Sequence, residues 1–188
     1  EAVEDAPQGG TNIIIDGKPH YSLPGFPVTV KKGDEVEVGD RLSEGILDVK
    51  DMISLRGLGS GRQHYVNYLQ EVFDNSGLYA SKKNLEYLAR GALDHVRISG
   101  NDEVAGFLPD DLASYNGIAS SYAPPKDAVI KDPSSSIGKY LHNPALHYTV
   151  GTKITKKMSE NLKDMGFDKL IVSDNPAEFS PEMVRLRT

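Results

Sequence analysis

The stretch from Arg62 to Val96 reads RQHYVNYLQEVFDNSGLYASKKNLEYLARGALDHV and contains two amphipathic segments with a short polar connection. The first segment repeats apolar side chains at helical spacing and stops at Gly77, which suits a left-handed helix cap. In the second segment Ser81 is placed to cap a helix whose apolar stripe is Leu85, Leu88, Ala89, Ala92 and Val96. Two such helices with a short loop are typical of a helical hairpin, which we predict here, with its first helix over about 62–75.

A glycine-rich segment, RGLGSGR, precedes this hairpin. Asp48 is placed to cap a short helix over Val49–Leu55, and the glycines are expected to end it. Backbone N–H groups and two arginines near a helix start favour an anion such as phosphate, so the candidate contacts are Arg56, Gly57, Gly59, Gly61 and Arg62. The segment lacks the strand of a dinucleotide motif and the Gly-Lys-Ser of a P-loop, and the alternative is a sharp turn between two helices.

The N-terminal part is rich in turn signals. Ile13–Ile15 reads as a buried strand that ends at the tight-turn pair Asp16-Gly17. The stretch 30–45, VKKGDEVEVGDRLSEG, carries two Gly-Asp pairs, and strands are expected at Val28–Val30 and Glu35–Val38. The turns resemble those of biotinyl and lipoyl carriers, but no lysine stands in the required setting. A turn-rich sandwich hairpin is the preferred interpretation.

The C-terminal part begins with a polar run over 98–145 that reads as loop or linker. A strand at Tyr148–Gly151, a helix capped by Thr155 and ending at Gly166, and a strand at Lys169–Ser173 then predict a small β-α-β module. The predicted fold class is α+β, a barrel-sandwich-like β module with an inserted helical hairpin. The expected divisions are a flexible acidic lead-in (1–11), the sandwich and hairpin (12–122), a linker (123–137) and the β-α-β module with its tail (138–188).

The composition excludes several functions. A net charge of −6 and a pI near 5.4 argue against a protein that coats duplex nucleic acid, although contact with nucleic acid stays open. There is no cysteine, no apolar run long enough for a membrane, and no histidine pair at metal-binding spacing, so we expect no metal, no cofactor and no membrane partner. No nucleophile motif is present, and no catalytic residue is assigned. The chain starts at Glu1, which suggests a processed product or part of a longer polypeptide.

Residues 28–112 resemble the C-terminal region of the β′ subunit of bacterial-type multisubunit RNA polymerase. The shared features are the Gly-Asp turn, LSEG at 42–45, KDM at 50–52, LRG at 55–57, QEVF at 70–73, KNLEYLAR at 83–90 and FLP at 107–109. The segment Val150–Val172 resembles a strand-helix-strand unit that lies earlier in the β′ chain. The family's magnesium-binding motif NADFDGD and its mobile catalytic segment have no counterpart in this sequence.

The resemblance implies a non-catalytic structural and interaction module that works with other protein subunits in a larger assembly, for which a phage is the expected source. Its expected interaction surface includes Gln70, Phe73, Arg90 and Phe107. One version is a subunit fragment of a phage multisubunit RNA polymerase that is active in transcription. The alternative is a virion structural protein, a head or portal domain, that reuses the fold. The expected location is soluble, in the virion or the host cytoplasm.

Overall fold

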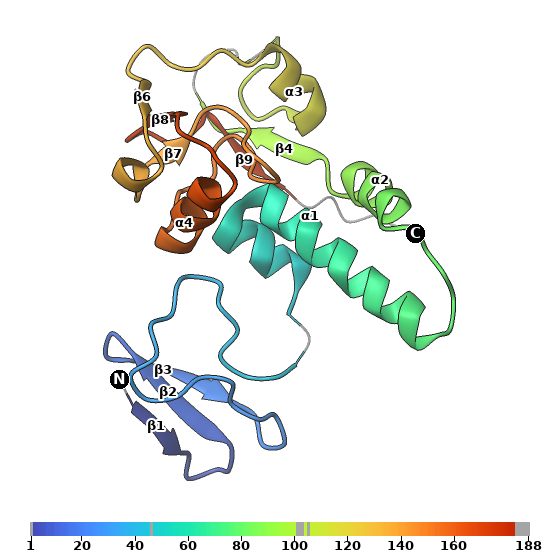
Figure 1. The fold of residues 1–188 in the computed structure, drawn as a ribbon, viewed down its shortest axis with the longest axis vertical. Helices are drawn as coiled ribbons and strands as arrows, with labels where there is room; N and C mark the ends of the chain where they lie inside the picture. Colours follow the sequence, from blue (N-terminus) through green and yellow to red (C-terminus); the bar gives the residue numbers. More distant parts are fainter. Residues whose placement is uncertain (1, 46, 101–103, 105, 183–188) are drawn as a thin grey trace. The chain divides into compact units, whose positions relative to one another are not determined.

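The computed structural model describes residues 2–45, 47–100, 104 and 106–182, and the chain divides into two compact units, Glu1–Asp48 and Val49–Thr188. Figure 1 shows the elements along the chain. The division falls just before the first helix, so it differs from the boundaries expected at residues 11, 122 and 137. The fold is α+β, as predicted, and the described residues form three small antiparallel sheets and no barrel.

The first unit contains one sheet of three antiparallel strands, β1 (Ala2–Asp5), β2 (Thr11–Ile15) and β3 (Lys18–Ser22), in that order. Asp16 and Gly17 join β2 to β3 with positive φ angles of 48° and 72°, which confirms the predicted tight turn. Within the segment expected as a flexible lead-in (1–11), Ala2–Asp5 pairs along its whole length with β2. Cross-strand hydrogen bonds order a segment that has little apolar area of its own.

The two Gly-Asp pairs of the first unit form equivalent turns. Asp34 donates its backbone N–H to the Lys31 carbonyl (3.1 Å) and accepts the Lys31 N–H on its carboxylate (2.8 Å). Asp40 repeats this pattern with Glu37, at 3.0 and 2.9 Å. Each turn is completed by a glycine with positive φ, Gly33 at 97° and Gly39 at 82°.

These turns replace the strands predicted at Val28–Val30 and Glu35–Val38, which the structure does not form. Val28 and Ser43 form an isolated bridge with a backbone hydrogen bond on each side, Thr29 N–H to the Leu42 carbonyl and Glu44 N–H to the Pro27 carbonyl. Val38 is 62% exposed rather than buried. The alternation of valine and glutamate suggested a strand, but the Asp34 and Asp40 carboxylates accept backbone N–H groups within their own turns. The residues left between the two turns are too few for strand pairing. The barrel-sandwich part of the fold prediction is therefore not found in the described residues.

The second unit begins with a helical hairpin of α1 (Val49–Asn75) and α2 (Lys82–Ala92), which confirms the predicted hairpin. The glycines of RGLGSGR bend α1 instead of forming a separate loop. Only Gly57 departs from helical geometry, with φ 84° and ψ 168°, and the kink there joins the two helices expected from the sequence. The helix bends so that Ile53 packs against Gly61. Gly77 has φ 68°, as expected for a helix cap.

Beyond the hairpin, two further antiparallel sheets form, β5-β4-β9 and β6-β8-β7. Their elements, with two helices and a 3₁₀ turn, are β4 (His95–Ile98), β5 (Leu112–Ser114), α3 (Tyr115–Ser121), β6 (Val129–Lys131), η1 (Ser134–Ser136), β7 (Tyr140–Leu141), α4 (Lys156–Asp164), β8 (Leu170–Ser173) and β9 (Phe179–Pro181). The expected linker at 98–145 therefore contains regular structure. The strand predicted at Tyr148–Gly151 is absent, whereas α4, capped by Thr155, and β8 confirm the rest of that module.

Three apolar clusters hold the second unit together. The first cluster contains Val96, Ile98 and Ile118 and joins the β5-β4-β9 sheet to α3 and the start of α1. Another contains Leu162, Leu170 and Val172 and packs α4 on β8. The third, Val66 with Leu85 and Ala89, seals the two hairpin helices. These residues are all less than 4% exposed, so most of the stabilising apolar burial is concentrated here.

Candidate functional site

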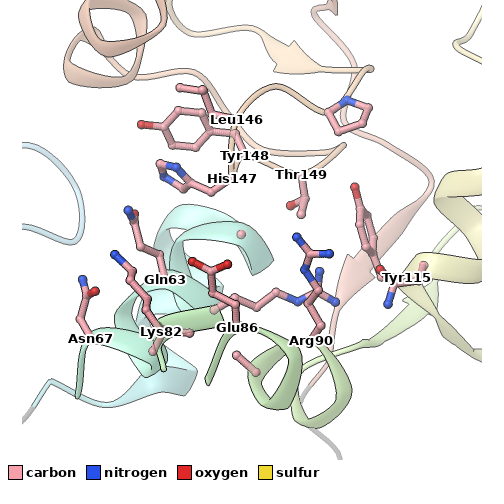
Figure 2. Close-up of a pocket in the computed structure, with 16 residues that line it drawn as sticks. Gln63, Asn67, Lys82, Glu86, Arg90, Tyr115, Leu146, His147, Tyr148 and Thr149 are labelled. Carbon is pink, nitrogen blue, oxygen red and sulfur yellow. The ribbon is translucent and has the colours of Figure 1, made fainter. Parts of the chain in front are cut away.

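A cavity of about 530 Å³ lies beside the helical hairpin of the second unit (Figure 2). This volume falls within the range of ordinary ligand pockets, about 300–1,000 Å³. Its walls come from α1, α2, the start of α3 and the loop that ends at Thr149. The lining residues are Gly59, Arg62, Gln63, Val66, Asn67, Lys82, Glu86, Ala89, Arg90, Tyr115, Asn116, Pro144, Leu146, His147, Tyr148 and Thr149.

Helical spacing sets the side chains on the two hairpin walls. On α2, Lys82, Glu86 and Arg90 are four residues apart and share one face, next to the buried Ala89. On α1, Gln63 and Asn67 are likewise one turn apart. Figure 2 shows the side chains of Gln63, Lys82, Glu86 and Arg90 gathered between the helices and the loop. The two walls therefore present amides on one side and charges on the other.

The loop wall is a tight connection in which Ala145 and Tyr148 exchange two backbone hydrogen bonds, of 3.1 and 2.9 Å. Leu146 lies in the left-handed region at φ 54°, an uncommon conformation for a branched side chain. The rings of His147 and Tyr148 are 4.0 Å apart. Burial lowers the pKa of His147, so its ring is neutral at neutral pH.

An ion pair closes the inner end of the cavity. Arg62 donates from Nε to the Leu93 carbonyl (2.7 Å) and from its terminal nitrogen to the Asp94 carboxylate (2.8 Å), and both side chains are largely buried. Asp94 also accepts from the Ser114 hydroxyl and the Asn116 N–H. Burial lowers the pKa of Arg62, and Asp94 opposes this effect. The aspartate therefore links α1, the end of α2 and the start of α3.

Tyr115 continues this inner wall. Its backbone N–H donates to the Asp94 carbonyl (2.6 Å), and the Arg62 guanidinium lies 5.5 Å from the centre of its ring. Its hydroxyl accepts the backbone N–H of Val150 at 3.0 Å. Burial raises the pKa of Tyr115. These contacts attach the loop after Tyr148 to the helical hairpin and fix the shape of the cavity.

The remaining charged groups of the cavity have no such partners. Within the part of the chain that the structure describes, Lys82, Glu86 and Arg90 form no ion pair, and the side chains of Gln63 and Asn67 form no hydrogen bond. Arg90 also lies close enough to Arg62 to lower its pKa, although less than burial does. The cavity thus offers two cations, one carboxylate and two amides to a ligand.

The residues predicted to contact an anion have clear packing roles. A Cβ atom on Gly59 would lie 1.7 Å from the His147 carbonyl oxygen, and one on Gly61 would lie 2.1 Å from an Ile53 side-chain carbon. Gly57 forms the bend of α1, Arg56 is half-buried, and Arg62 is bonded to Asp94. Gly59 and Arg62 reach the cavity together. The anion contact itself stays a prediction.

The four residues predicted as an interaction surface are separated by the fold. Gln70 bonds to Asp74 along α1 (3.0 Å), and Phe73 packs against the hairpin cluster. Phe107 packs against the cluster that contains Val96 and Ile98, and it forms a β-bridge with Val104. Arg90 alone lines the cavity. Whether these residues contact a partner stays a prediction.

Sequence reasoning missed the other cavity residues. The spacing of Lys82, Glu86 and Arg90 was a usable signal, because three charged residues four apart must share a helix face. No local signal places His147 and Thr149 against Gly59, since the two segments are far apart in the chain and meet only in the fold.

A second cavity of about 490 Å³ includes Tyr122, Asp127, His142 and Asn175. Tyr122 and His142 are bonded at 2.7 Å, and the other ring nitrogen of His142 lies 3.2 Å from the Asn175 carbonyl, which can only accept. The tyrosine hydroxyl and the imidazole are therefore partners of each other, and the second ring nitrogen faces a carbonyl acceptor. Burial raises the pKa of Tyr122 to about 12. The Ser173 hydroxyl and the Asn175 amide hold the pKa of Asp127 low. These partners satisfy the polar groups, as expected for structural contacts.

Among the described residues, no cluster of three histidines or carboxylates is arranged to hold a metal ion. No helix in the described ranges is both long and apolar enough to cross a bilayer.

The fold and the cavity define a small α+β module organised around a helical hairpin. No family model matches the chain. Its sequence is 27% identical over 156 residues to the β′ subunit of DNA-directed RNA polymerase from Pelodictyon phaeoclathratiforme, covering 82% of this chain and 10% of the relative. It is 35% identical over 104 residues to the subunit from Chlorobium phaeovibrioides, covering 54% and 7%. The match to Salinibacter ruber is 26% identical over 166 residues, covering 85% and 11%.

These matches confirm the resemblance seen in the sequence: the chain contains a β′-like region, related to a part of the polymerase subunit. It spans about a tenth of the length of the relatives that it matches over most of its residues.

Proposed function

We propose that the chain is a non-catalytic structural and interaction module of a multisubunit RNA polymerase, acting within a larger, phage-encoded assembly. The observation that carries the proposal is the β′ similarity over 82–85% of the chain, which extends through most of its length rather than one motif. The relatives are named as subunits of DNA-directed RNA polymerase, and a subunit region of this kind functions among other protein chains. Identities of 26–35% indicate a divergent relative of these bacterial subunits, and the phage source is part of the proposal.

Exposed apolar side chains on the hairpin support a docking role. Leu78 and Tyr79 at the connection are 59% and 92% exposed, and Tyr87 and Leu88 on α2 are 64% and 58% exposed. Exposed apolar side chains, and tyrosines in particular, are frequent at protein interfaces. In the proposal these residues contact a neighbouring subunit, which buries them in the assembly.

The proposal places the chemistry of RNA synthesis in partner chains. Phosphoryl transfer by two metal ions requires closely spaced carboxylates, and this sequence contains no Asp-x-Asp-x-Asp motif. The module would contribute shape and contacts, not reacting groups.

The test is affinity purification of the tagged full chain from the cells that produce it, followed by identification of its partners and a template-dependent RNA synthesis assay. We expect polymerase subunits in stoichiometric amounts and RNA synthesis by the complex. Recovery only in capsids, in symmetric copy number, would instead support a virion structural protein and overturn the proposal.

A matched pair of variants makes this test specific to the hairpin. Leu88→Ser should reduce recovery of the polymerase subunits about tenfold, because it removes an apolar contact at the proposed interface. Met165→Ser, a comparable change at a side chain 63% exposed just after α4, should leave recovery unchanged. Equal loss in both variants would contradict docking through the hairpin.

A further inference from the structure

The cavity beside the hairpin combines partnerless charges with a strained loop. Lys82, Glu86 and Arg90 line it without ion pairs in the described structure, and Leu146 lines it with its backbone in a left-handed conformation. In a tight two-residue connection this position ordinarily favours glycine or asparagine. Backbone strain of this kind persists where surrounding structure enforces it, and it is concentrated at binding sites.

The strain has a consequence for the cavity surface. The Leu146 side chain is 47% exposed, so the conformation is not explained by burial of the leucine in the core. Gly59 removes the side chain that would otherwise collide with the neighbouring His147 carbonyl, and the loop is held in place by Tyr115. Leu146 is thus an apolar residue in the lining of the cavity, to which α2 contributes charged side chains.

We propose that this cavity binds a short acidic peptide segment of a partner protein, with two carboxylate side chains on Lys82 and Arg90 and an apolar side chain between them on Leu146. The inference deepens the proposed docking function and rests on it.

The spacing of the charges defines the segment. Lys82 and Arg90 are eight residues apart on α2, which corresponds to about 12 Å along the helix axis. An extended peptide advances about 3.4 Å per residue, so two acidic residues roughly three or four positions apart match this span. Glu86, midway between the cations, is placed to accept a peptide N–H, and the amides of Gln63 and Asn67 can pair with its other backbone groups.

The charge balance favours a peptide over a nucleic acid. Glu86 lies between the two cations and would repel a phosphate strand, whereas separate carboxylates can reach Lys82 and Arg90 on either side of it. Nucleic-acid binding also gains from many clustered cations, and this chain has a net charge of −6. Arg62 is already neutralised by Asp94, so an incoming carboxylate would find Arg90 as the available arginine.

The experiment measures binding of the full chain to a fluorescent, acetylated and amidated peptide that carries two glutamates four positions apart around a leucine in a glycine-serine background. We expect saturable binding that is lost when both glutamates are replaced by glutamine. Absence of binding, equal binding of the glutamine peptide, or displacement by uridine monophosphate at lower concentration than by the unlabelled peptide would overturn the inference.

A lysine on another helix provides a matched control. Lys82→Gln should weaken binding about fivefold, and Arg90→Gln about tenfold, because each removes one charge-assisted contact. Lys163→Gln makes the same change at an exposed position on α4, away from the residues that line this cavity, and binding should stay within about twofold of the parent. Equal weakening by the two lysine changes would show that general charge, rather than this cavity, attracts the peptide.

Leu146→Gly separates binding from folding. Glycine suits the left-handed position, so the variant should fold at least as well as the parent, yet it should weaken peptide binding about tenfold by removing the apolar contact. Unchanged affinity would contradict the role of Leu146.

The peptide assay also distinguishes the two proposals. A chain that assembles with polymerase subunits but does not bind the peptide would overturn this inference alone. A chain that binds the peptide but does not assemble with those subunits would overturn the proposed function.

Discussion

Glycine and aspartate have different roles in the two units. In the first unit, Gly33 and Asp34 form a turn through their own backbone and side-chain contacts, and a Cβ atom on Gly33 would meet nothing within 4 Å. In the second unit, Gly59 has ordinary helical geometry but is pressed against His147, and Asp94 joins three distant elements. The same residue types thus act locally in one region and through tertiary contacts in the other. Matched substitutions in the two units test this difference by their effects on stability.

The largest effect is expected for Gly59→Ala. The added methyl group would lie 1.7 Å from a backbone oxygen, which cannot move without displacing the loop, so we predict a loss of about 3 kcal/mol or more in unfolding free energy. Gly91→Ala is the control, because its Cβ meets nothing within 4 Å, and alanine should stabilise α2 by about 0.5–1 kcal/mol. Urea denaturation measures both; equal effects would show that Gly59 is not a close-packing position.

Asp94→Ala should lower the unfolding free energy by about 2–3 kcal/mol. The change leaves the largely buried Arg62 without its carboxylate and removes acceptors for Ser114 and Asn116. Asp34→Ala is the matched change in a local turn and should cost about 0.5–1 kcal/mol. Thermal and urea unfolding compare the two, and similar losses would contradict the tertiary role assigned to Asp94.

Gly33→Ala tests the opposite case, in which conformation rather than space requires glycine. With φ at 97°, alanine should cost about 1–2 kcal/mol although no atom obstructs its methyl group. Amide hydrogen exchange should show the loss in residues 2–45 while protection in the helical hairpin is kept. Exchange rates that rise equally in both units would indicate that the two are coupled in stability.

A pH titration addresses the tertiary contact of Tyr122. Its pKa is about 10 in the unfolded chain and is raised to about 12 by burial in the fold, so the protonated form is favoured in the native state. The resulting stability is fully present below pH 10 and is lost as the pH rises from 10 through 12. Allowing for partial solvent screening, the effect is on the order of 1 kcal/mol. Tyr122→Phe should lack this part of the alkaline decline, and an identical decline in both proteins would contradict the assignment.

The smallest effect on stability is expected for Leu146→Gly. Relief of the left-handed strain is offset by the greater freedom of glycine in the unfolded chain, so stability should be unchanged or raised by up to about 1 kcal/mol. A loss above about 1 kcal/mol in urea denaturation would mean that the leucine side chain stabilises the fold itself.

Much of the regular structure could be predicted where local rules act alone. The hairpin, the caps at Gly77 and Thr155, and the turn at Asp16-Gly17 all follow from spacing and from residues with strong conformational preferences. The secondary structure was predicted wrongly where it depends on contacts with other segments. Ala2–Asp5 becomes a strand only because β2 supplies partners, and α3 lies in a segment whose composition reads as loop.

The candidate site divides in the same way. The face shared by Lys82, Glu86 and Arg90 is contained in the helical repeat, and the β′ resemblance could be read from ordered motifs along the chain. Two other contacts join residues far apart in sequence: the approach of His147 to Gly59 and the burial of Arg62 against Asp94. Short-range hydrogen bonding and helical periodicity determined the first set. Packing and desolvation, which depend on where distant segments meet, were decided only by the tertiary structure.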